Sequence, residues 1–87
     1  MDFMAEIIDP EIYGLPKRTL LEKEGRTLYL VIDRKSRVIM ADGRKIMLKV
    51  EQIRSADPKI KIGLKINAPL CSKTKAFLEE AGLKVIL

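Results

Sequence analysis

The last third of the chain, residues 59–87, decides the fold and reads KIKIGLKINAPLCSKTKAFLEEAGLKVIL. Isoleucine and leucine alternate with lysine and glycine over 59–66, and this period of two predicts a strand with one buried and one basic face. After Pro69 the apolar residues take helical spacing up to Gly82, which stands where a helix-ending residue with positive φ is expected. Residues 83–87 are again apolar except for Lys84. Strand, helix and strand in this order predict a βαβ unit with parallel strands and a right-handed crossover.

The middle of the chain predicts an antiparallel meander. From Thr19 the apolar residues follow a period of two, and we expect four strands, at 18–24, 27–33, 37–41 and 44–50. The second should be central, because apolar side chains point to both of its faces. Asp42-Gly43 is typical of a two-residue hairpin turn. The segment 44–55 stays open between strand and helix, since its apolar residues also fit a helical face.

The first residues give shorter signals. Residues 3–8 are ambiguous between strand and helix. Asp9-Pro10 is a good helix start, but Gly14 and Pro16 stop the helix, so we expect a single turn or 3₁₀ piece at 10–13.

Length and composition limit the architecture. With 87 residues, 47% of them hydrophobic and 33% charged, the chain has room for one globular domain. We predict an α+β domain: a mixed sheet of about five to six strands, with the antiparallel meander followed by the C-terminal βαβ unit, and one main helix. One helix leaves much of the other sheet face uncovered. We therefore expect a homodimer through that face or through an edge strand.

Composition also indicates the setting of the protein. A single Asn and a single Gln beside 11 Lys and 7 Glu are typical of hyperthermophile proteins. The chain has no apolar run near the roughly 18 residues of a spanning helix, and its first residues are acidic, so we expect a cytoplasmic protein with no membrane partner. One Cys and no His cannot build an internal disulfide or an ordinary zinc cluster. We expect no metal and no cofactor.

The helix expected after Pro69 carries its charges in the unfavourable order. Lysines lie in its early turns and glutamates at its end, at a cost of about 0.3–1 kcal/mol for each exposed charge. Because local rules tend to be broken at functional sites, we predict an anion site at the helix start. Its candidate residues are Asn67, Cys71, Ser72, Lys73 and Lys75. The alternative is that Lys75 and Glu79 form an exposed ion pair across one helical turn.

Residues 68–82 resemble the active-site turn and first helix of glutaredoxins, where a strand ends in Cys-Pro-x-Cys and a lysine-bearing helix runs to a glycine. Ala68 stands at the position of the nucleophilic first cysteine, and Cys71 at that of the resolving second one. The resemblance implies thiol-dependent redox chemistry through Cys71. A thiol at a helix N-terminus beside Lys73 is expected to have a lowered pKa. The alternative is that Cys71 is a small buried hydrophobic residue.

The net charge of +5 indicates a polyanionic partner. No DNA-binding motif is visible and the aromatic residues are not interleaved with the lysines, so we predict weak, sequence-independent contact with nucleic acid. Lysines that protect strand edges from aggregation are the alternative. The candidate residues lie on the strand before Asn67 and at the expected hairpin turns: Arg34, Lys35, Arg37, Arg44, Lys45, Lys59, Lys61 and Lys65.

The acids suggest a third class of function. A nuclease of the restriction-enzyme type holds Mg²⁺ with an acid on one strand and an acid-x-Lys triplet on the next. Asp57-Pro58-Lys59 is such a triplet, whereas Asp33 and Asp42 are better explained as turn residues. The leading hypothesis is a non-enzymatic binding module, the second a thiol-dependent protein, and the third a nuclease.

Overall fold

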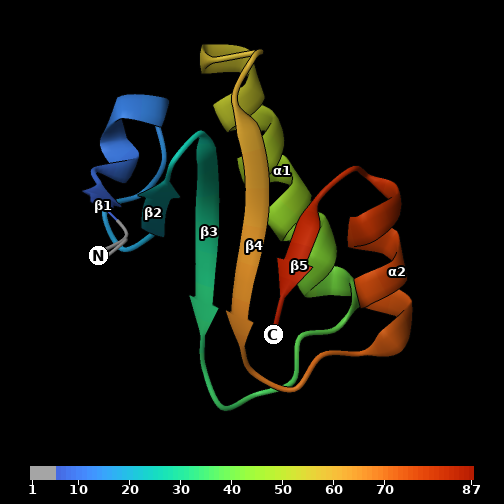
Figure 1. Ribbon diagram of the computed structural model, residues 1–87. Coiled ribbons are helices and arrows are strands. Elements are labelled where there is room, and N and C mark those ends of the chain that lie inside the picture. Colours follow the sequence, from blue (N-terminus) through green and yellow to red (C-terminus); the bar gives the residue numbers. More distant parts are fainter. Residues whose placement is uncertain (1–5) are drawn as a thin grey trace.

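The sheet has five strands in the order β1-β2-β3-β4-β5 in the computed structural model, which describes residues 6–87 (Figure 1). The first three strands form an antiparallel meander: β1 (Glu6–Ile8), β2 (Leu20–Glu24) and β3 (Thr27–Asp33). The last two extend it in parallel: β4 (Lys61–Asn67) and β5 (Lys84–Ile86). The connections contain the 3₁₀ turn η1 (Pro10–Tyr13) and two helices, α1 (Met40–Ala56) and α2 (Ser72–Glu80). The predicted α+β class, with a meander followed by a βαβ unit, is confirmed.

The core lies between one face of the sheet and the two helices. Leu28 and Leu30 of β3 point to this face and are almost fully buried, as is Leu64 of β4. α1 covers them with a helical stripe that includes Val50 and Ile53, both 0% exposed. Both crossovers lead to the next strand in the same direction, so both helices lie on the same side of the sheet (Figure 1).

The strand predicted at 37–41 is wrong, because α1 already begins at Met40, and of the two alternatives left open for 44–55 the helix is the one that forms. Its buried residues recur at helical spacing, and burial of that stripe outweighs the turn signal of Asp42-Gly43. The Asp42 carboxylate accepts a hydrogen bond from the backbone N–H of Ile39 at 3.0 Å and so caps the first turn. The main helix is therefore α1, with 17 residues, and not the helix of the βαβ unit.

Of the segment 3–8, left open between strand and helix, residues 6–8 form β1, and 3–5 lie outside the described residues. The other element predictions hold, with one shift. The 3₁₀ turn at 10–13 and the central place of β3 are confirmed, and Gly82 has φ +87° just after α2. The helix was expected directly after Pro69, but α2 begins at Ser72 and its N-cap residue is Cys71. The reason is that the chain after β4 stays extended, since the Pro69 carbonyl accepts a hydrogen bond from the N–H of Val38 at 2.8 Å.

The second face of the sheet is covered by no other element among residues 6–87, and it is called the uncovered face below. Tyr29 lies at its centre and is only 6% exposed. The Lys65 ammonium sits 4.9 Å from the centre of the Tyr29 ring and pairs with Glu22, at 3.0 Å, and with Glu24. Lys65 thus spans from β4 across β3 to β2 and shields the ring from water. Gly63 makes room beneath it, because a Cβ there would lie 2.7 Å from Tyr29 Cε1.

Gly43 is the contact point of the two helices and provides a first prediction. A Cβ at this position would lie 2.9 Å from Cγ2 of Thr74, whose branched side chain on α2 has little freedom to move. We expect Gly43→Ala to lower the free energy of unfolding by about 1–2 kcal/mol, although alanine favours helices over glycine by about 1 kcal/mol. Urea denaturation measures the change.

Thr74→Ser removes the clashing methyl group and supplies the matched partner variant. We expect the double variant to be more stable than the sum of the two single effects allows, by about 1 kcal/mol. Additive effects, or a stabilising Gly43→Ala, would contradict the close approach of α1 and α2.

Candidate functional site

The loop after β3 and the loop after β4 are joined to each other by backbone hydrogen bonds. The N–H of Arg34 donates to the carbonyl of Asn67 at 3.2 Å, and that of Val38 to Pro69 at 2.8 Å. The Val38 carbonyl in turn accepts from the N–H of Cys71 at 3.1 Å. These bonds continue the parallel pairing of β3 with β4 beyond the sheet. As a result, α1 and α2 begin beside each other at the edge where both strands end, at the bottom of Figure 1.

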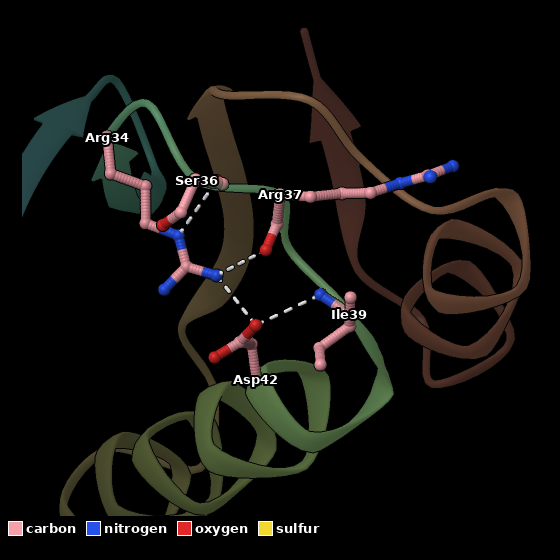
Figure 2. A network of polar contacts seen from close by, with 5 residues as sticks. All are labelled: Arg34, Ser36, Arg37, Ile39 and Asp42. Atoms are coloured by element: carbon pink, nitrogen blue, oxygen red, sulfur yellow. Dashed lines mark hydrogen bonds and ion pairs between the residues drawn. The ribbon is translucent and has the colours of Figure 1, made fainter.

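Arg34 fixes the shape of the first of these loops (Figure 2). Its guanidinium donates to the carbonyls of Ser36, at 3.2 Å, and Arg37, at 2.9 Å, and forms an ion pair with Asp42 at 2.6 Å. This hydrogen bond from Arg34, followed by the one from the Ile39 N–H, holds the pKa of Asp42 below its ordinary value. Arg34 is therefore occupied within the fold, although it was predicted as a nucleic-acid contact.

Six other cations surround the two helix starts and form what we call the basic edge. The ion pairs within residues 6–87 use only Arg34 and Lys65 as cations, so these six have no such partner there. The acids nearby are engaged: Asp42 pairs with Arg34, and Asp33 accepts a hydrogen bond from the Asn67 side chain at 3.0 Å. The positive ends of both helix dipoles add to the field. The basic edge consists of Lys35, Arg37, Arg44, Lys45, Lys73 and Lys75.

The structure thus brings part of the predicted anion site together with part of the predicted nucleic-acid site, and it places the remaining nucleic-acid candidates elsewhere. The basic edge combines lysines from the predicted anion site with four of the predicted nucleic-acid contacts. Lys59 and Lys61 lie at the opposite edge, where α1 and α2 end, and Lys65 lies on the uncovered face between two glutamates. The sequence grouped the cations of 35–45 at expected hairpin turns, but it did not bring them together with Lys73 and Lys75, because that contact depends on the crossover through α1.

Cys71 stands at the start of α2 as its N-cap residue and is half-buried, not fully buried as the alternative prediction had it. The backbone N–H groups of Thr74 and Lys73 lower the pKa of the Cys71 thiol, and the charge of Arg37 contributes a smaller effect in the same direction. Neither amide forms a hydrogen bond of normal geometry to the sulfur. The positive end of α2 thus lowers the pKa of the Cys71 thiol without a hydrogen bond of normal geometry.

The other predicted anion-site residues have different roles. Asn67 ends β4 and binds Asp33, and Ser72 is exposed in the first turn of α2. The ion pair proposed as an alternative, Lys75 with Glu79, is not among those formed within residues 6–87.

The acids do not gather at a site. Within residues 6–87 no three His, Cys, Asp or Glu side chains lie close enough together to hold a metal ion. Sequence reasoning missed a second acid-x-Lys triplet, Asp33-Arg34-Lys35, which directly follows the strand β3. On β2, Glu22 shares the uncovered face with Asp33 but is in register with Tyr29, and its carboxylate binds Lys65. The two carboxylates are therefore held apart.

Comparison with known proteins gives no match to a family model, a curated protein or a solved structure. Among residues 6–87, neither helix combines the length and the apolar character needed to cross a membrane. The function must therefore be inferred from the arrangement of the side chains.

The ion pair of Asp42 gives a prediction on pH. We expect Asp42→Asn to lower the free energy of unfolding by about 1 kcal/mol at pH 7, because it removes both the cap of α1 and the partner of Arg34. A carboxyl whose pKa is lowered by folding stabilises the protein above its unfolded pKa, and this contribution is lost as the pH falls through the folded pKa. The difference between wild type and variant should therefore shrink below pH about 3.8. Urea titrations at several pH values measure it.

Glu51→Gln is the matched control, since Glu51 is exposed on α1 and forms no ion pair within residues 6–87. It should change stability little at any pH. A difference for Asp42→Asn that stayed constant from pH 7 to pH 2 would contradict the ion pair.

The position of Cys71 predicts a reactive thiol. The rate of alkylation by iodoacetamide should follow a titration whose midpoint lies below about 8.5, the value for an unperturbed thiol. The urea-unfolded protein serves as the control and should return the midpoint to that value. A folded midpoint equal to or above the unfolded one would show that the helix amides do not act on the sulfur.

Proposed function

We propose that the protein is a small binding module that contacts nucleic acid through the phosphate backbone at its basic edge, weakly and without sequence preference. The observation that supports this most is the joining of the two crossover loops, which brings two helix starts and six cations to one edge. Phosphates are the ligands that suit such an arrangement, because they accept hydrogen bonds from side chains and from free backbone amides.

An extended polyanion suits this edge better than an enclosed small molecule. The hollow beside Arg34 and Lys45 has a volume of about 120 Å³, whereas sites for small ligands usually measure about 300–1,000 Å³. The cations are spread over the loop after β3 and the first turns of two helices, as contacts along a strand of phosphates require. The one aromatic residue of α2, Phe77, packs against the core and offers no stacking platform. Affinity should therefore come from charge and fall steeply with salt.

The opposite edge has a larger hollow, of about 460 Å³, whose lining includes Arg54, Lys61 and Lys84. Three features weaken its positive field. Arg54 donates to the carbonyl of Ala81 at 3.4 Å, the negative ends of both helix dipoles lie there, and Glu80 ends α2. The two edges carry similar numbers of cations but opposite helix ends, which makes them a natural pair for comparison.

A thiol-dependent function of Cys71 is the second candidate, and its N-cap position favours it; the alkylation experiment above tests it. A Mg²⁺-dependent nuclease is supported less, since the carboxylates are held apart. For the partner, we retain the proposal of a homodimer.

The test compares two triple variants that remove the same charge. Arg37→Gln/Lys45→Gln/Lys73→Gln changes the basic edge, and Lys23→Gln/Arg26→Gln/Lys59→Gln changes the opposite edge, where these three residues line one hollow away from the uncovered face. Fluorescence anisotropy with a labelled single-stranded oligonucleotide measures the affinity at several salt concentrations. We expect the first variant to bind at least about tenfold more weakly. Each phosphate contact on a single strand contributes about 0.7 to the slope of log K against log salt, so the loss of three contacts should make this slope shallower by about 2.

The opposite-edge variant should bind almost as wild type does. Equal losses in the two variants would mean that only net charge matters and would overturn the assignment of the site. No binding by the wild-type protein at low salt, or binding that does not weaken as salt is raised, would overturn the function itself.

A further inference from the structure

The uncovered face of the sheet carries charges of opposite sign on its two sides. By the strand register, β2 contributes Glu22 and Glu24, whereas the parallel strands contribute Lys61, Lys65 and Lys84. The central strand β3 separates the two groups. Lys65 reaches across β3 to both glutamates, so this part of the face keeps a net charge of −1 (two glutamates and one lysine), whereas Lys61 and Lys84, which form no ion pair within residues 6–87, leave +2 on the other side.

Apolar side chains occupy much of the rest of this face, beside the polar residues Thr27, Asp33 and Asn67. Ile7 on β1 is 83% exposed and Leu20 on β2 is 54% exposed, although both are large hydrophobic residues. Leu20 is in register with Val31 on β3, and Ile86 is on the same row of β5. Exposed apolar residues next to ordered charges are typical of surfaces that bind another protein.

We propose that a second copy of the chain covers this face, with a two-fold axis parallel to the strands and close to β3. Rotation about this axis sets β2 of one copy opposite β4 of the other, so that Glu24 faces Lys61 of the second copy and the reverse contact forms as well. An axis across the strands would instead set β2 against β2 and glutamate against glutamate. The charges therefore favour the first arrangement over the second. A two-fold symmetric dimer requires a self-complementary surface, and this face provides one.

The size of the face suits a weak dimer. The five strands lie about 4.8 Å apart and contain 3, 5, 7, 7 and 3 residues, or 25 residues of about 3.3 Å each. They therefore present roughly 400 Å² per copy and about 800 Å² for the pair, in the range of weak interfaces below about 1,200 Å². Two sheets packed face to face keep their strands within about 30° of each other, which agrees with an axis along the strands. We expect a dissociation constant of the dimer in the micromolar range. The dimer does not involve the basic edge, so it does not depend on the proposed function.

A charge swap tests the axis. Lys61→Glu places a glutamate opposite Glu24 of the second copy and should weaken the dimer at least about tenfold, since the repulsion occurs twice. The double variant Glu24→Lys/Lys61→Glu should restore dissociation to within about threefold of wild type. Glu24 pairs with Lys65 within the chain, so circular dichroism and urea denaturation check that each variant is folded. Analytical ultracentrifugation from about 1 to 300 µM measures the mass against the monomer value of 9.9 kDa.

Cross-linking supplies a second readout that does not depend on charge. In a Cys71→Ser background, Val31→Cys should be joined to its own counterpart by a short bismaleimide, because Val31 lies on β3 next to the axis. Ser55→Cys, exposed on α1 and away from the face, is the matched control and should give no cross-linked dimer. A monomer throughout the concentration range, or a dimer that resists the charge swap and is cross-linked equally well by both variants, would overturn the proposal.

Discussion

The backbone hydrogen bonds between the two crossover loops are the interaction on which the rest of the structure depends. They extend the pairing of β3 with β4 through Val38, which is 0% exposed, and hold Pro69 and Cys71 in an extended conformation. Because the chain stays extended to Cys71, α2 begins there and not at Asn67. The same bonds place the start of α1 beside that of α2, so the fold and the candidate site share one cause.

The two faces of the sheet are shielded from water in different ways. The helix face is closed by apolar side chains, and Gly43 lets the two helices approach each other over it. The uncovered face is closed only at its centre, where Lys65 reaches over Tyr29 to two glutamates. The hydrogen bonds to Glu24 and Glu22 raise the pKa of Lys65, so the bridge and the charged form of the ammonium stabilise each other. The apolar residues around this bridge remain exposed, and they are the part of the fold that a partner would stabilise.

Sequence reasoning succeeded where a local signal had no competitor. The alternation of 59–66, the helical spacing after Pro69 and the glycine at 82 led to the correct βαβ unit. It failed at 37–43, where Asp42-Gly43 resembles a hairpin turn, and it left 44–55 open between strand and helix. In the folded protein Asp42 caps a helix and Gly43 fits against α2, and both roles depend on residues distant in the sequence. The candidate site followed the same rule: its lysines were recognised, but their assembly at one edge required the crossover that the sequence did not reveal.

Amide hydrogen exchange, read residue by residue by NMR, tests the central claim most directly. The amides of Val38 and Cys71 lie in loops, yet both donate across the junction between them, to Pro69 and Val38. The account predicts that these two amides exchange as slowly as those in the centre of β3 and β4, because all of them open only with the parallel pairing. Exchange at the rate of unstructured loop residues, such as Lys35 in the same loop, would contradict it, since the two helix starts would then have no common anchor.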